Sequence, residues 1–204
     1  MTEDIDKTDL LLSGLLNYFQ VATPIKKVNT VNALIEEVLE ENKVQLEEKR
    51  AHLFKKLEEN LPEIIVPDEQ LKYILRSVLQ YIILSIPPNG NIELLTTSSL
   101  FQRDPGGTQA FFERFGGYIE ISVAFLGEPA AALRRTPIPQ KDGALEFMLR
   151  LVKGMVLKNW GKMNFETDKK EGKTALSLRF PLERRNVVFY EPIRMNRFAG
   201  HPES

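Results

Sequence analysis

The sequence predicts an α+β domain with two layers, in which helices cover one face of a mixed, mostly antiparallel sheet, preceded by a short N-terminal helix. Three observations support this. Helical and strand periodicities follow one another as helix, helix, strand, helix, strand, strand, helix, strand, strand. One helix is apolar over most of its circumference, so it must be buried on most sides. The helices fall between pairs of strands, as in layered α+β domains.

The composition is that of a soluble globular protein, and it argues against nucleic-acid binding and against cysteine-based chemistry. The chain has 204 residues, of which 43% are hydrophobic and 27% are charged. The net charge of -1 provides no basic field for nucleic acid. The sequence contains no cysteine, which excludes disulfides, thiolate metal sites and thiol nucleophiles. An acidic N-terminus unlike a signal peptide, and the lack of an apolar run of about 20 residues, lead us to expect a cytoplasmic protein.

Residues 8–22 predict a short amphipathic helix. Its apolar stripe follows the spacing i, i+3, i+4, i+7 and consists of Leu12, Leu15, Leu16 and Phe19. Pro24 ends the helix, so we treat residues 1–24 as a separate N-terminal segment. A stripe this apolar must dock, either on its own domain or on a second copy of the chain. The second possibility makes these four residues a candidate dimer interface.

The main domain is expected between residues 25 and 183. Its predicted elements are helices over 30–48, 69–86 and 144–159 and strands over 50–57, 91–98, 118–125, 162–168 and 173–180. In the last strand, alternate residues should face the core, namely Thr174, Leu176, Leu178 and Phe180. Residues 184–204 form a C-terminal arm or tail, in which NVVFYEPI (186–193) either adds an edge strand or docks as an arm.

No standard catalytic or cofactor signature is present in the sequence. It has no phosphate-binding loop, no dinucleotide glycine fingerprint and no nucleophile elbow. Of the two histidines, His52 lies in a predicted strand and His201 in the tail, and neither has neighbours in sequence that complete a metal site or a catalytic triad. On motifs alone, we predict no catalytic residue and no metal ligand.

Four phrases resemble a known family when they are taken in order. LLSGLLNYFQVATP resembles the end of the second helix of the dimerisation hairpin of sensor histidine kinases. VNTVNALIEEVLEENKVQLEEKRAHL, LPEIIVPDEQLKYILRSVLQYI and GKMNFETDKKEGKTALSLRFPL resemble parts of the catalytic ATP-binding domain of the same kinases, whose fold is shared with gyrase B. The resemblance to the ATP-binding domain runs from Lys26 to Glu183. It implies a layered α/β domain that takes part in two-component signal transduction.

The helix over 69–86 departs from the family at its metal-binding positions. The family carries two asparagines four residues apart, one of which binds the Mg²⁺ held by the triphosphate. With Asp68 and Leu71 aligned, these positions are Ser77 and Tyr81. Ser77 can still form a hydrogen bond. Tyr81 cannot replace a carboxamide oxygen as a ligand of a hard cation without losing its proton.

Two glycine-rich motifs of the family are altered as well. The family's Asp-x-Gly-x-Gly, whose aspartate binds the adenine amino group, corresponds here to FLGEP. Phe125 stands at the aspartate, Gly127 matches the first glycine and Pro129 replaces the second. In the last glycine motif, which cradles phosphates at a helix N-terminus, only Gly143 remains. Glu146 adds a negative charge there, and the bulky Phe147 and Met148 suit core packing.

These departures predict a degenerate kinase domain that neither binds ATP nor transfers phosphate, and that acts as a protein-interaction or regulatory module. No cofactor is expected under this hypothesis. An alternative is a divergent kinase that still binds ATP and Mg²⁺, with phosphates met by Arg134, Arg135 and Lys141. A second alternative, a histidine phosphotransferase, requires a helical histidine that this sequence lacks. The first hypothesis also predicts that Tyr81 and Phe125 lie near each other.

Overall fold

The order of helices and strands in the structure follows the predicted order. A computed structural model of the protein describes residues 29–100, 116–126, 143–168 and 172–182, together with Leu12, Leu15 and Leu16. The elements are α2 (Val31–Glu41), α3 (Lys43–Glu48), β1 (His52–Leu57), α4 (Asp68–Ser85), β2 (Asn91–Leu100), β3 (Gly117–Leu126), α6 (Gly143–Lys158), β4 (Lys162–Asp168) and β5 (Lys173–Pro181). The predicted strands are therefore all present, with ends that differ by up to two residues.

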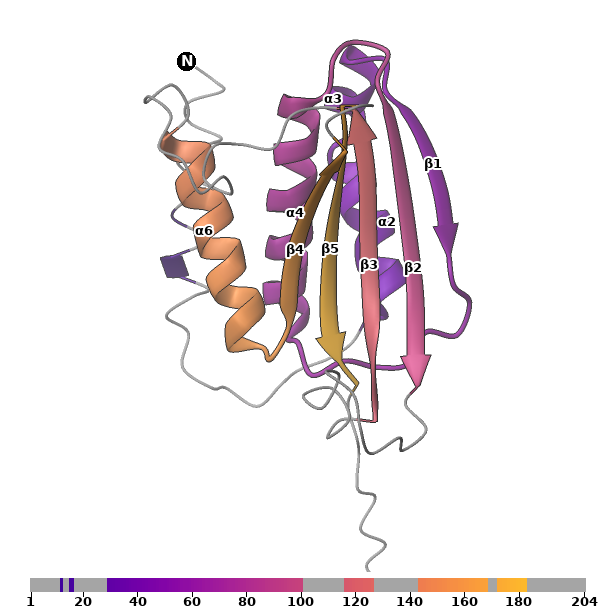
Figure 1. The fold of residues 1–204 in the computed structure, drawn as a ribbon, viewed down its shortest axis with the longest axis vertical. Helices are drawn as coiled ribbons and strands as arrows, with labels where there is room; N and C mark the ends of the chain where they lie inside the picture. Colours follow the sequence, from indigo (N-terminus) through magenta and orange to yellow (C-terminus); the bar gives the residue numbers. More distant parts are fainter. Residues whose placement is uncertain are drawn as a thin grey trace, which may run out of the picture.

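The strands form a single mixed sheet. Its order is β1-β2-β3-β5-β4 across five strands. β1 pairs with β2 in parallel, and the remaining neighbours are antiparallel. Helices α2, α4 and α6 lie on one face of this sheet (Figure 1). The fold class predicted from the sequence is confirmed.

The core lies between the sheet and the helices. In β5, the predicted inward residues Thr174, Leu176, Leu178 and Phe180 are all buried, and the residues between them are half-buried. The buried residues of α4 cover most of its circumference. They make it the central helix of the domain, as its apolar sequence predicts.

The helix predicted over 30–48 is in fact two helices. The break occurs at Asn42, which is buried, and whose Nδ2 donates a hydrogen bond to the carbonyl of Val38 at 2.8 Å. A side chain that bonds to a carbonyl one turn back competes with the helical pattern. Asn42 thus ends α2, and α3 continues after it.

The acidic face of α2 is paired with basic residues of α4. Lys72 Nζ lies 2.7 Å from Glu37 and 2.9 Å from Glu41, and Arg76 Nη2 lies 2.6 Å from Glu41. Burial of the Glu41 carboxylate raises its pKa, but hydrogen bonds from Lys72 and Arg76 outweigh burial and hold the pKa below its ordinary value. Hydrogen bonds to Glu37 and Glu41 raise the pKa of Lys72. We call these four residues the α2–α4 charged seam.

The start of α2 is tied to the start of α4. Thr30 caps α2 by accepting a hydrogen bond from the amide of Ala33 at 3.2 Å. The carboxylate of Asp68 accepts two hydrogen bonds from Asn29, from the backbone amide at 2.9 Å and from the side-chain amide at 3.2 Å. The chain therefore enters the domain beside the first turn of α4.

The N-terminal stripe is described only in part. Leu12, Leu15 and Leu16 are helical, Leu12 and Leu16 are 53% and 70% exposed, and Phe19 lies outside the described residues. The segment 184–204 also lies outside them. Within the described ranges, no helix is both long and apolar enough to cross a membrane.

Candidate functional site

Tyr81 is the centre of an aromatic cluster that joins α4 to the sheet. Its ring meets Phe125 of β3 with centroids 6.0 Å apart and planes at 83°. It meets Phe165 of β4 with centroids 6.1 Å apart and planes at 79°. Tyr81 and Phe125 are fully buried, and Phe165 packs against the core. The sequence-based prediction that Tyr81 and Phe125 lie near each other is confirmed.

These rings occupy the space between α4 and one end of the β3–β5 pair. Phe125 stands opposite Thr174 of β5, and Phe165 stands opposite Leu176. Both β5 residues are fully buried. T-shaped ring pairs are a favourable packing arrangement, so this region has the character of a hydrophobic core. Phe165 was not singled out from the sequence, although the alternation of KMNFETD places it on the same strand face as Met163.

Ser77 lies one turn before Tyr81 and is also fully buried. In the described part of the chain, its hydroxyl and that of Tyr73 have no hydrogen-bond partner of good geometry. Burial raises the pKa of Tyr73, and the nearby Ser77 hydroxyl offsets this effect only in part. These two hydroxyls give α4 a small polar spot within an apolar environment.

Gly127 and Gly143 are the two positions that the sequence matches to glycine motifs of the family. Gly143 is the first residue of α6, and Gly127 lies outside the described residues. Glu146 pairs with Arg150 one turn later at 2.5 Å. Met148 is buried as predicted. The prediction for Phe147 is wrong, because its side chain is 44% exposed.

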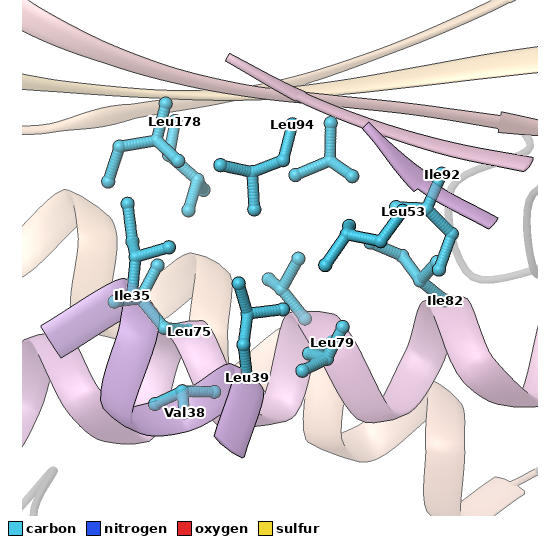
Figure 2. Close-up of a pocket in the computed structure, with 13 residues that line it drawn as sticks. Ile35, Val38, Leu39, Leu53, Leu75, Leu79, Ile82, Ile92, Leu94 and Leu178 are labelled. Carbon is cyan, nitrogen blue, oxygen red and sulfur yellow. The ribbon is translucent and has the colours of Figure 1, made fainter. Parts of the chain in front are cut away.

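Ile82 does not share the aromatic cluster's surroundings. It lines a separate apolar cavity of about 30 Å³ that lies between α2, α4 and the sheet (Figure 2). The lining side chains are all aliphatic and come from α2, α4 and every strand except β4. Neither Tyr81 nor Phe125 belongs to this lining. Ile82 is itself buried in the core, on the side of α4 that faces this cavity.

The described residues contain no group of three or more histidine, aspartate or glutamate side chains placed to hold a metal ion. Arg134, Arg135 and Lys141, the candidate phosphate-binding residues, lie outside the described ranges. His52 lies in β1 and is exposed.

The arrangement of the sheet and helices matches solved histidine kinases. The nucleotide-free catalytic domain of histidine kinase ThkA gives a TM-score of 0.54 at 17% identity and covers 76% of this chain and 93% of that one. The chain has the fold of a histidine kinase catalytic domain. The cytoplasmic segment of histidine kinase QseC gives a TM-score of 0.55 at 9% identity, with 88% of this chain and 95% of that chain covered.

The structure of full-length histidine kinase ShkA in complex with AMPPNP is also similar to this chain. Its TM-score is 0.62 at 17% identity, and the match covers 88% of this chain but 36% of ShkA. No protein-family model and no curated protein matches the sequence. The comparisons therefore show a fold shared with kinase catalytic domains.

Proposed function

We propose that the chain is a degenerate histidine-kinase-type domain, which neither binds ATP nor transfers phosphate and serves as a protein-interaction or regulatory module in signalling. The observation that carries this proposal is the packing of Tyr81 against Phe125. The resemblance to the family places a magnesium-binding asparagine at the first position and an adenine-binding aspartate at the second. In this chain, two buried rings in contact stand there.

The chemistry of these rings supports the loss of nucleotide binding. A phenyl ring offers adenine no conventional hydrogen-bond acceptor, and an unpaired polar group on the ligand costs about 1–3 kcal/mol. A phenol with its proton is a poor ligand for Mg²⁺, which prefers carboxylates, carbonyls and water. Opening a nucleotide site would also separate rings that stabilise the fold.

Melting temperature with and without nucleotide tests this proposal. A ligand at 100 times its Kd stabilises a fold by about 2.7 kcal/mol, which corresponds to several degrees in a domain of this size. We expect no shift with Mg-ATP, Mg-ADP or Mg-AMPPNP at millimolar concentration. ShkA, which has been solved with AMPPNP, is the positive control. A saturable shift in this chain contradicts the proposal and favours the divergent kinase that retains ATP and Mg²⁺.

A phosphotransferase role has less support. Phosphotransfer of that type needs a histidine presented on a helix, whereas His52 lies in the edge strand β1. Incubation with a phosphorylated receiver domain tests this role directly. Acid-labile phosphate on His52 would support the phosphotransferase role.

We further propose that the module acts in the cytoplasm and forms a homodimer through Leu12, Leu15, Leu16 and Phe19. The QseC match is a cytoplasmic segment, and the exposed Leu12 and Leu16 leave apolar surface for a second copy. Light scattering should give the mass of a dimer for the chain and of a monomer for Leu12→Glu/Leu16→Glu. Leu95→Glu, at an exposed leucine of β2, is the control and should remain a dimer. An unchanged mass in the double variant contradicts the proposed interface.

A further inference from the structure

Strand β1 forms the edge of the sheet opposite to β4 (Figure 1). It pairs with β2 on one side, and no described strand lies on its other side. The amide of His52 donates to the carbonyl of Gly90 at 2.9 Å, so the backbone groups of His52 point toward the start of β2. Because these groups alternate along a strand, those of Leu53, Lys55 and Leu57 point away from the sheet. Such an open row is a template for a further strand.

Phe54 exposes its ring at the middle of this edge. Leu53 lines the cavity between the helices and the sheet, so Phe54, the next residue, lies on the face of the sheet away from α2 and α4. Its side chain is 60% exposed, and Leu95 of β2, on the same face, is 37% exposed. These two side chains give the open edge an apolar spot of the kind that anchors a protein contact.

The same edge carries positive charge. Residues 49–56 read KRAHLFKK and contain four lysines or arginines, one histidine and no acidic residue. The acid opposite Phe54 in the sheet, Glu93, is already engaged by Lys173 at 3.0 Å. Lys56 is exposed, and no described residue forms an ion pair with it. The charge around Phe54 therefore favours an acidic partner.

The alternation of β1 specifies the pattern of such a partner. In a strand added to the open row, every second side chain lies on the face of His52, Phe54 and Lys56. When an apolar side chain stands opposite Phe54, the side chains two residues away on each side stand opposite His52 and Lys56. Carboxylates suit both positions, because Lys56 is a cation and an imidazole N–H donates a hydrogen bond to a carboxylate. The pattern is acid-x-apolar-x-acid, and it is the same in both strand directions.

We propose that β1 is a docking edge for an extended acidic segment of a partner protein, which adds a sixth strand to the sheet with this pattern centred on Phe54. Main-chain hydrogen bonds to the open row provide affinity, and the side chains around Phe54 provide specificity. A second copy of β1 does not meet the pattern, because it carries His52 and Lys56 where acids are required. The inference rests on the proposed role as an interaction module, but it uses no residue of the aromatic cluster around Tyr81.

Fluorescence anisotropy with the full chain and a labelled peptide, Thr-Glu-Val-Phe-Val-Glu-Thr, tests this inference. We expect saturable binding, and a peptide with lysines in place of both glutamates should bind at least about tenfold more weakly. Lys56→Glu should weaken the acidic peptide by about tenfold and strengthen the lysine peptide. Lys162→Glu, the same charge change at the exposed start of β4, is the matched control and should bind as the parent chain does. The absence of saturable binding up to millimolar concentration, or an equal loss in both variants, overturns the proposal.

Residue-resolved amide exchange shows which edge the peptide occupies. At saturating acidic peptide, the amides of Leu53, Lys55 and Leu57 should exchange at least about tenfold more slowly, and those of β4 should not change. Protection of β4 without protection of β1 overturns the proposal. The outcome is separate from that of the nucleotide test. Failure of peptide binding without a nucleotide-induced melting shift overturns the β1 site alone, whereas peptide binding together with such a shift overturns the loss of ATP binding alone.

Discussion

The rings of Tyr81 and Phe125 meet in a T-shaped arrangement with centroids 6.0 Å apart, and they join the central helix to the middle strand of the sheet. Both side chains are fully buried, which makes the contact part of the core. A kinase that had to admit a nucleotide between these positions could not keep them in contact. The same pair therefore supports the proposed loss of ATP binding, and it should contribute measurably to the free energy of unfolding.

Tyr81 and Phe125 should be energetically coupled. Tyr81→Leu and Phe125→Leu should each lower the free energy of unfolding by about 1–3 kcal/mol, because both remove buried ring atoms. The loss in the double variant should differ from the sum of the single losses by about 0.5–1.5 kcal/mol, the usual coupling of an aromatic pair. Urea denaturation measures these values. Phe54→Leu, at a ring that is 60% exposed, should change stability by less than about 0.5 kcal/mol. Strict additivity of the buried pair would argue against the contact.

The apolar cavity of Figure 2 should accept an added methylene group. Val78 lines it, and Val78→Ile should raise the free energy of unfolding by about 1 kcal/mol as the cavity of about 30 Å³ is filled. Val152→Ile, at a fully buried residue of α6 outside that lining, should destabilise by about 1 kcal/mol or more through overpacking. Thermal and urea denaturation measure both changes. The same sign for both variants would mean that the cavity is not available.

Gly161 and Gly172 should respond to alanine for different reasons. A Cβ at Gly161 would lie 2.7 Å from the carbonyl oxygen of Arg179 and 2.9 Å from the ring of Phe180. We expect Gly161→Ala to cost about 2–3 kcal/mol, because backbone must move. Gly172 has a φ of +64 with open space around it, so Gly172→Ala should cost about 1 kcal/mol from conformation alone. Denaturation that ranks Gly172→Ala as the more damaging change would contradict the packing at the end of α6.

The α2–α4 charged seam should make stability depend on pH. The pKa of Glu41 is lowered in the folded state, so its contribution is present above the unfolded pKa of about 4.3 and is lost as pH falls through the folded value. Glu41→Gln should cost about 0.5–1 kcal/mol at pH 7, the range of partly exposed ion pairs. The difference from the parent should shrink in acid, where Glu41 is itself protonated.

Glu40→Gln is the matched control for the seam. Glu40 is one residue away and more exposed than Glu41, and its partner is Lys43, the first residue of α3. It should change stability by about 0.3 kcal/mol or less at any pH. Urea denaturation between pH 3 and pH 8 measures both variants. If Glu41→Gln lowers the free energy of unfolding by the same amount across this pH range, the ion pairs of Glu41 do not account for the loss.

Local periodicity accounts for the features of the fold that could be predicted from the amino-acid sequence. Element order, the inward row of β5 and the burial of α4 follow from spacings of two and 3.6 residues, which any segment carries within itself. The proximity of Tyr81 and Phe125 was predictable because the resemblance to the kinase family supplied the topology. The break at Asn42 was not apparent, because Asn42 reads as polar, and its burial depends on packing around α2.

Which surfaces meet depends on the packing of the whole domain and could not be predicted from local patterns. This packing paired the acidic face of α2 with Lys72 and Arg76, turned Ile82 toward a separate cavity, added Phe165 to the aromatic cluster and left Phe147 exposed. Each of these outcomes depends on contacts between elements far apart in the chain. A helix pattern shows that a residue lies on an apolar face but not which neighbour covers that face, and this is why Phe165 could not be assigned to Tyr81 from the sequence.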